Sequence, residues 1–125
     1  MNYRHGFHAG NHADVLKHLV LVTLLDALKR KDAPFFVLDT HAGRGRYDLT
    51  GGQATKTGEA KSGIRKVWAA KPSGPSALAS FLKAVEASQA GAPDSYPGSP
   101  LLVSQALRPQ DRFAACEVVA DEAAA

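Results

Sequence analysis

Apolar residues recur with a helical period between residues 15 and 31, on a face wider than a surface helix needs. The apolar positions are Val15, Leu16, Leu19, Val20, Val22, Leu24, Leu25, Ala27 and Leu28. Asn11 or Asp14 can cap the start of this helix. Lys29–Lys31 would complement the helix dipole in the last turn, and Pro34 follows the end. We therefore expect one long helix with a wide apolar face here.

Two short apolar runs predict strands. Phe35–Leu38 is continuous and rich in residues that favour strands, and Asp39 follows it directly. Such a run is typical of a strand buried on both faces in a parallel sheet. Arg112–Cys116 is a second strand candidate and is also followed by an acidic residue, Glu117. Strands that alternate with helices indicate the α/β class. We expect the two strands to be adjacent and parallel, with the helix from about Asp14 to Lys31 packed against the sheet.

Three further helices are predicted between Pro- and Gly-rich breaks: Ile64–Ala70, Ser76–Ala90 and Leu101–Leu107. Residues 48–63 are polar and rich in Gly and Thr, which favours a loop. Tyr96–Pro100 forms a rigid turn before the last helix, and Pro100 suits a first helical turn. This turn could present the Ser99 hydroxyl to a ligand, although chain reversal alone also explains it.

Composition limits the possible function classes. The chain has 125 residues, 45% hydrophobic and 22% charged, which fits at most one domain and argues against general disorder. The net charge of +3 permits a polyanionic partner without requiring one. No run approaches the roughly 18 apolar residues of a membrane span, and the N-terminus lacks the apolar core of a signal peptide. The single cysteine, Cys116, excludes an intramolecular disulfide and a cysteine-based zinc site, so we expect a cytoplasmic protein.

The strongest local chemical signal is Asp39-x-x-x-Gly43-x-Gly45, directly after the first predicted strand. In open α/β sheets, ligands bind at the carboxyl ends of strands, and glycines there allow a close approach of the backbone. The pattern resembles the first motif of class I S-adenosylmethionine methyltransferases. Glu117 could accept hydrogen bonds from a cofactor ribose at the end of the second strand. The alternatives are a tight turn without a ligand and a solvated or helix-capping Glu117.

Histidines are concentrated near the N-terminus, where His5, His8, His12 and His18 lie. No Cys or Glu-x-x-His partner is nearby, so hydrogen bonding or contact with nucleic acid is favoured over metal binding. Tyr3 and His5 could contact an RNA base, although a disordered tail would also explain them. Lys17 and His18 cannot share one helix face, so we expect one of them to point inward.

Four segments together resemble one known family: Tyr3–His18, Leu38–Tyr47, Thr57–Glu59 and Tyr96–Pro100. Their residues, order and spacing are similar to those of the bacterial large-subunit (23S) ribosomal RNA adenine-N6 methyltransferases of the J type. That family is more than twice as long as this chain. The sequence resembles its N-terminal part.

The resemblance implies an incomplete class I methyltransferase sheet, Rossmann-like, with a helical insertion after the first strand. It divides the chain into an arm, first helix, first strand and cofactor loop (1–47), the helical insertion (48–95), and a truncated return to the core with the second strand (96–125). It implies S-adenosyl-L-methionine as the cofactor and 23S ribosomal RNA as the partner. A monomer is expected for the full-length protein, with no membrane contact.

Site residues are also implied by the resemblance. The cofactor-contacting positions are His18, His41, Ser99 and Glu117, and Tyr3 is the position near the substrate nucleotide. Candidates with a weaker claim are His5, Lys17, Asp39 and Gly43. No metal site is implied.

The sequence departs from the family pattern at the catalytic motif. The family's Asp-Pro-Pro-Tyr motif, which holds the adenine amino group, is absent, so the catalytic Asp is expected in a missing part. The later Asp-Gly is absent too, and Val118-Val119-Ala120 replaces the usual Leu-His-Pro. We expect the chain alone to be inactive. A non-catalytic RNA-binding or adapter fragment is the alternative, and a nucleotide-binding piece of another α/β enzyme fits the N-terminal arm poorly.

Overall fold

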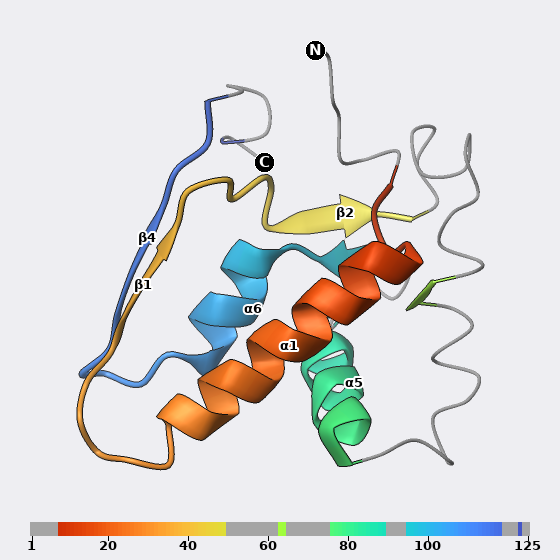
Figure 1. The fold of residues 1–125 in the computed structure, drawn as a ribbon. Helices are drawn as coiled ribbons and strands as arrows, with labels where there is room; N and C mark the ends of the chain where they lie inside the picture. The colour runs from red at the N-terminus through yellow and green to blue at the C-terminus, as the bar shows by residue number, and fades with distance from the viewer. Residues whose placement is uncertain (1–7, 50–62, 65–75, 90–94, 119–122, 124–125) are drawn as a thin grey trace.

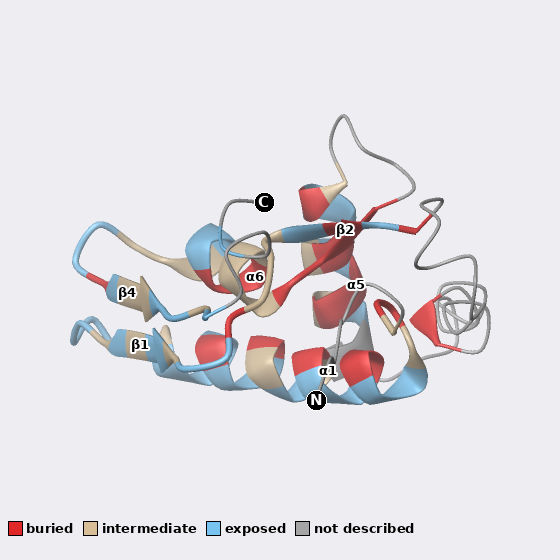
Figure 2. Cartoon of the chain, turned by 90° about the horizontal axis from the view of Figure 1, so that it is seen from above, coloured by how far each residue is buried: buried red, intermediate tan, exposed pale blue. Residues whose placement is uncertain are grey.

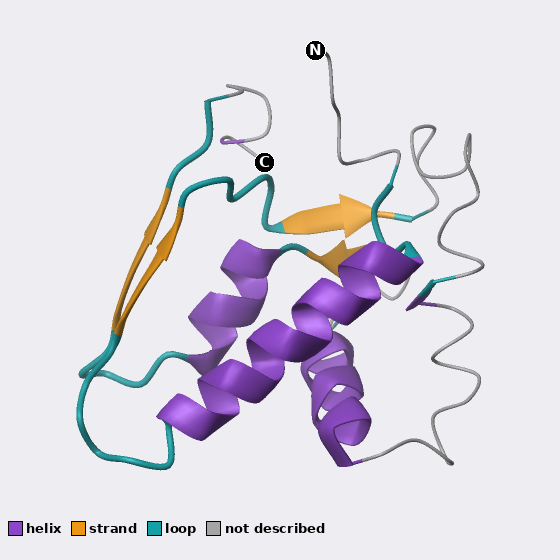
Figure 3. Cartoon of the chain, in the orientation of Figure 1, coloured by secondary structure: helices purple, strands orange, loops and turns teal. Residues whose placement is uncertain are grey.

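The computed structural model describes residues 8–49, 63–64, 76–89, 95–118 and 123. These residues form a mixed α/β structure (Figure 1, Figure 3). Its helices and strands, in chain order, are α1 (His12–Leu28), β1 (Phe36–Asp39), β2 (Arg46–Asp48), α5 (Ser76–Ser88), β3 (Ser95–Pro97), α6 (Ser99–Ala106) and β4 (Arg112–Ala115).

β1 and β4 form a parallel pair, which confirms the two predicted strands and their adjacency. Phe36 lies opposite Arg112, and Asp39 lies opposite Ala115. Because the strands are parallel, their carboxyl ends meet at one edge. The residues that follow Asp39 and Ala115 are therefore brought together.

The prediction that the first strand is buried on both faces is wrong for the described structure. Phe36 and Leu38 are exposed, whereas Val37 and Asp39 are partly buried. α6 contacts both β1 and β4 and covers one face of the pair, and no other described helix covers the opposite face (Figure 2). The continuous apolar run gives β1 apolar side chains on both faces, and α6 covers only one of these faces.

The sequence patterns did not indicate the second pair of strands. β2 and β3 pair antiparallel, with Tyr47 opposite Tyr96. Each strand has only three residues, too few for an alternating pattern to be recognised. Arg46 directly follows the Gly43-x-Gly45 motif, and Tyr96 and Pro97 lie in the predicted turn. Both tyrosines are buried, so this small pair contributes to the core.

α1 begins as predicted, but it ends earlier. The Asn11 side chain caps it by accepting a hydrogen bond of 2.9 Å from the Asp14 backbone N–H. The helix ends at Leu28, so Lys29–Lys31 lie beyond its last turn. Arg108 donates to the carbonyl oxygens of Lys29 and Lys31, which holds this segment in a turn.

The helices pack mainly on one another. α1 makes its main contacts with α5 and α6, not with β1 and β4 as expected. The core residues include Val15, Val22, Tyr47, Phe81, Leu82, Val85, Tyr96 and Leu102. The predicted helix at 76–90 is confirmed by α5. The predicted helix at 64–70 lies outside the described residues apart from Ile64, and the division at residues 48 and 96 stays a prediction.

Arg108 and Asp111 join the α1–β1 connection to the loop before β4. The Asp111 carboxylate accepts hydrogen bonds from Arg108 Nε at 3.0 Å, the Arg108 backbone N–H at 2.9 Å and the Phe35 backbone N–H at 3.1 Å. The Arg108 guanidinium also donates to Ala33 and lies over the Phe35 ring. These contacts support the start of the β1–β4 register, where Arg112 N–H donates to the Phe35 carbonyl.

This cluster predicts acid sensitivity. The Arg108 side chain lowers the pKa of Asp111 from 3.8 to about 2, backbone N–H groups of Arg108 and Phe35 add to the effect, and desolvation opposes it. Because the folded-state pKa lies below the unfolded-state value, the stabilisation is present above about pH 4 and is lost as the pH falls toward about 2. We expect the urea midpoint of the wild-type chain, followed by circular dichroism, to drop across that window.

An Asp111→Asn variant should be less stable than wild type at pH 7 and should show a smaller further loss between about pH 4 and about pH 2. Asp32→Asn removes an exposed carboxylate and should keep the wild-type pH profile. An unchanged profile in the Asp111 variant would show that this carboxylate does not link folding to protons.

Candidate cofactor site

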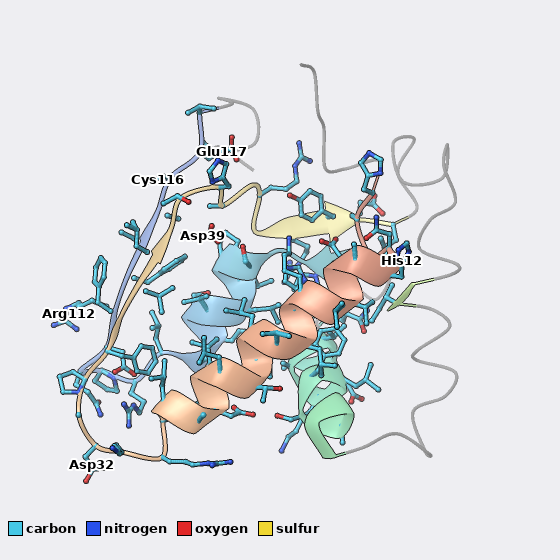
Figure 4. The ribbon with its side chains drawn as sticks, viewed as in Figure 1. His12, Asp32, Asp39, Arg112, Cys116 and Glu117 are labelled. Carbon is cyan, nitrogen blue, oxygen red and sulfur yellow. The ribbon has the colours of Figure 1, made fainter. Side chains whose placement is uncertain are left out.

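The candidate site lies where β1, β4 and α6 meet. Asp39 is the last residue of β1, Glu117 follows β4, and Ser99 opens α6. Figure 4 shows Asp39, Cys116 and Glu117 at one end of the strand pair, with Arg112 at the other. This is the carboxyl edge, where open α/β sheets bind ligands.

Asp39 connects the strand to the helix and to the loop. Its Oδ2 accepts a hydrogen bond of 2.5 Å from the Ser99 hydroxyl, and its Oδ1 accepts one of 3.2 Å from the His41 backbone N–H. Both carboxylate oxygens therefore have partners within the protein. Asp39 is placed to position Ser99 and the start of the loop.

Gly43 contacts the Glu117 carboxylate through its backbone. The Gly43 N–H donates to Glu117 Oε1 at 2.9 Å, and the Ala42 N–H donates to the Cys116 carbonyl at 2.9 Å. Gly43 has a φ of +66°, a conformation that favours glycine. A Cβ at this position would also meet the Tyr47 hydroxyl at 2.5 Å. The first glycine of the motif is thus required by the fold itself.

The segment before α6 holds the other side of the loop. The Gly98 N–H donates to the Gly45 carbonyl at 2.9 Å, and the Arg44 N–H donates to the Tyr47 hydroxyl at 3.3 Å. A Cβ on Gly98 would overlap the Arg44 carbonyl oxygen, whereas a Cβ on Gly45 would meet nothing within 4 Å. The loop therefore packs tightly at Gly98 and is open at Gly45.

His18 points inward and Lys17 lies at the surface, which agrees with the expectation that one of the two points inward. His18 is only 2% exposed, and its Nδ1 lies 2.7 Å from the Tyr96 hydroxyl. Their rings are stacked, with centroids 5.5 Å apart. Burial, with a smaller contribution from Asp14, raises the pKa of Tyr96, which keeps its hydroxyl protonated. The Lys17 side chain is 61% exposed, and its Nζ lies 3.3 Å from Asp14 Oδ1.

The sequence-predicted residues fall into three groups. Those gathered at the strand ends are Asp39, His41, Gly43, Ser99 and Glu117. His18 is in the core, connected to the segment before Ser99 through Tyr96, and Lys17 is on the surface. Tyr3 and His5 lie outside the described residues.

Sequence reasoning missed the supporting roles of Tyr47 and Gly98. Tyr47 contacts the loop through its hydroxyl. Gly98, which has no Cβ, allows the Arg44 carbonyl oxygen of the loop to come close. The Tyr-Pro-Gly-Ser-Pro segment was the available signal for Gly98. Tyr47 ends the family-like segment Leu38–Tyr47, but no local pattern assigned it a role.

The donors and acceptors at this edge suit a polar organic ligand. Asp39 and Glu117 supply carboxylate oxygens, and Ser99 supplies a hydroxyl. Among the described residues, no group of three or more His, Cys, Asp or Glu side chains could hold a metal ion. Within the same part of the chain, no helix is long and apolar enough to cross a membrane.

Comparison with known proteins gives consistent matches. Residues 32–124 match the family described as "Ribosomal RNA large subunit methyltransferase D, RlmJ". The chain is 46% identical over 114 residues to ribosomal RNA large subunit methyltransferase J of Haemophilus influenzae, and 45% identical over 119 residues to that of Escherichia coli. It also resembles a crystal structure of a Legionella pneumophila protein, with a TM-score of 0.82 and 40% identity.

The matches cover most of this chain and less than half of each relative. They span 90% and 94% of this chain, but 40% of the Haemophilus and 42% of the Escherichia relative. For the Legionella structure the shares are 91% and 42%. More than half of each relative therefore has no counterpart here.

Proposed function

This chain belongs to the family of ribosomal RNA large subunit methyltransferases matched above, and on that premise we propose that it contributes part of an S-adenosylmethionine site to such an enzyme. The observation that carries the proposal is the placement of two hydrogen-bonded pairs, Gly43 with Glu117 and Ser99 with Asp39, at the carboxyl edge of β1 and β4. The proposed reaction is N6-methylation of an adenine in 23S ribosomal RNA.

The proposed fold is a class I methyltransferase sheet, Rossmann-like, of which β1 and β4 are two adjacent strands. Support comes from their parallel register and from the acidic residues at their carboxyl ends, since Asp39 is the last residue of β1 and Glu117 lies two positions beyond β4. The Gly43–Gly45 loop leaves β1 at the edge where such sheets bind nucleotides. The TM-score of 0.82 with the Legionella structure supports the same arrangement.

Glu117 is the proposed ribose ligand of the cofactor. A carboxylate can accept hydrogen bonds from two neighbouring hydroxyls, as acidic residues do in dinucleotide-binding folds. Gly45 lies in the adjacent loop and leaves open space in the direction of a Cβ. When bound, the cofactor supplies a methyl group on a sulfonium.

His41 and Ser99 are further proposed cofactor contacts. The His41 ring is exposed beside the loop, with Nδ1 2.9 Å from the Thr40 hydroxyl. Ser99 is held by Asp39 at the first turn of α6. His18 is also a proposed cofactor contact, and its buried ring is held by the Tyr96 hydroxyl.

Tyr3 is the proposed contact with the substrate nucleotide, and His5 and Lys17 are secondary candidates. An aromatic ring can stack on an unpaired base, and the reacting adenine must leave its stack to reach the methyl donor. Orientation of the adenine amine needs residues beyond this chain. We propose a cytoplasmic enzyme that is monomeric at full length.

The test compares this chain with a longer one. In the longer chain, the part of the Escherichia coli relative that follows the matched segment is joined to Ala125. We expect the 125-residue chain to bind S-adenosylmethionine weakly or not at all in calorimetric titration, and to transfer no methyl group to unmodified 23S ribosomal RNA. The longer chain should do both.

Two outcomes would contradict the proposal. Methyl transfer by the 125-residue chain alone would show that the catalytic groups are already present. A longer chain that binds the RNA but not the cofactor would favour the adapter function.

A further inference from the structure

Tyr96 and His18 form a buried hydrogen-bonded pair that joins β3 to α1. The Tyr96 hydroxyl lies 2.7 Å from His18 Nδ1, although the two residues are 78 positions apart in the chain. Tyr96 is 0% exposed and His18 is 2% exposed. The pairing of β3 with β2 holds the Tyr96 backbone, and the Tyr96 ring is stacked on the His18 ring. The contact is therefore a fixed part of the core.

A hydrogen bond between a phenol and an imidazole can form in two ways. In the first arrangement, Tyr96 donates its O–H to Nδ1, and a neutral His18 carries its own proton on Nε2. In the second, Nδ1 carries a proton and donates it to the Tyr96 oxygen, so the Tyr96 O–H needs a different acceptor. In neutral His18 the two arrangements give Nε2 opposite properties, a donor in the first and an acceptor in the second.

The hydrogen bonding of Tyr96 decides between the two arrangements. Within the described part of the chain, His18 Nδ1 is the single hydrogen-bond partner of the Tyr96 hydroxyl. The second arrangement would leave a buried O–H without an acceptor, which costs about 1–3 kcal/mol. Burial also raises the pKa of Tyr96, so the hydroxyl keeps a proton that it can donate. The first arrangement is therefore favoured.

Asp14 is an alternative acceptor that has to be considered. Its carboxylate is close enough to add to the raised pKa of Tyr96. Asp14 Oδ2 accepts a hydrogen bond of 3.0 Å from the Gly10 N–H, and Oδ1 lies 3.3 Å from Lys17 Nζ. Among the described residues, no hydrogen bond joins Asp14 to Tyr96. Asp14 therefore does not take the hydroxyl proton.

We propose that Tyr96 is a positioning residue that holds His18 in the neutral tautomer with its proton on Nε2. In this tautomer His18 acts at Nε2 as a hydrogen-bond donor and not as a base. Such a donor suits an acceptor atom of a ligand, such as a carboxylate or hydroxyl oxygen. The role of this donor toward S-adenosylmethionine rests on the proposed function, in which His18 contacts the cofactor. The tautomer itself does not depend on it.

Nuclear magnetic resonance of the 125-residue chain, labelled with nitrogen-15, tests the tautomer at neutral pH. Correlation of the ring nitrogens with the carbon-bound ring protons shows which nitrogen of each histidine is protonated. A His18→Gln variant assigns the His18 signals by their loss. We expect a protonated Nε2 and an unprotonated Nδ1 that accepts a hydrogen bond. A proton on Nδ1, alone or together with one on Nε2, would overturn the proposal.

Tyr96→Phe tests whether the hydroxyl sets the tautomer. The variant removes the donor to Nδ1, so the His18 signals should move toward the average of the two tautomers. Tyr47→Phe is the matched control, because it removes a buried hydroxyl from the facing residue of β2 that contacts Arg44 instead of His18. The control should keep the wild-type His18 signals.

An unchanged His18 pattern in the Tyr96 variant would show that another group sets the tautomer. Circular dichroism reports whether this variant is folded. If it is not, the wild-type Nδ1 signal decides, because an unprotonated nitrogen that accepts no hydrogen bond has a different chemical shift. Such a shift would also contradict the proposal.

The same Tyr96 variant in the longer chain tests the donor role toward the cofactor. With both tautomers equally populated, half of the molecules present the donor, so the affinity for S-adenosylmethionine should fall about twofold in calorimetric titration. Averaged His18 signals with wild-type affinity would overturn the donor role. A wild-type longer chain that binds no cofactor would contradict the proposed function and leave the tautomer assignment standing.

Discussion

A Gly98→Ala variant is expected to be destabilised by about 1–3 kcal/mol, the usual cost of forcing extra atoms into a packed site. The φ of Gly98 is −77°, which any residue can adopt, so the constraint is purely one of space. A Cβ here would overlap the Arg44 carbonyl oxygen, a backbone atom that can move only with its loop. That movement would also disturb the hydrogen bond from the Gly98 N–H to the Gly45 carbonyl. Urea denaturation followed by circular dichroism measures the loss.

Gly45→Ala is the matched control. A Cβ on Gly45 meets nothing within 4 Å, so the variant should unfold at the wild-type urea concentration. If the cofactor approaches this open space, the same variant in the longer chain should bind S-adenosylmethionine more weakly than wild type does. Equal stability of the Gly98 and Gly45 variants would contradict the steric argument.

These two glycines illustrate what the sequence could and could not predict. The motif Asp39-x-x-x-Gly43-x-Gly45 correctly placed a sharp loop after a strand, because a continuous apolar run and glycine spacing are local signals. It could not reveal which glycines the fold itself requires. Gly98 is required because of a backbone 54 positions away in the chain, and that contact exists only after folding.

The same distinction holds for the fold. The strands β1 and β4 and the cap of α1 at Asn11 were predictable, because each follows from a pattern within a few residues. The parallel pairing of the two strands was expected from the α/β class, not from either run alone. β2 and β3 were missed because their stability comes from Tyr47 facing Tyr96, not from local alternation. The apolar width of α1 was read correctly, but the pattern alone could not say which side faces the core.

The site was predictable to a similar extent. Asp39, Gly43 and Glu117 follow from strand ends and glycine spacing. In the structure the Gly43 N–H donates to Glu117, and Asp39 accepts from the His41 N–H of the same loop. The position of Ser99 against Asp39 depends on how α6 packs, which no local pattern specifies. The resemblance to the family named Ser99, and the structure supplies its partner.

In the longer chain, Glu117→Ala is expected to lower the affinity for S-adenosylmethionine roughly tenfold or more. Hydrogen bonds to a charged group contribute about 1.5–3 kcal/mol, and about 1.4 kcal/mol corresponds to a factor of ten in the dissociation constant. The variant also loses the acceptor for the Gly43 N–H, so the loop loses a support on the cofactor side. Calorimetric titration of the cofactor measures the effect, and unchanged affinity would remove Glu117 from the proposed cofactor site.

Tyr3→Ala serves as the contrasting variant in the same longer chain. Its proposed role is to position the substrate base, so cofactor affinity should match wild type while turnover on unmodified 23S ribosomal RNA falls. The two variants therefore separate the two parts of the proposed function: the Glu117 variant changes the titration, and the Tyr3 variant changes the methyl-transfer rate alone. A Tyr3 variant that lost cofactor affinity would instead place the N-terminal arm against the cofactor, and the proposed substrate contact would have to be assigned to another residue.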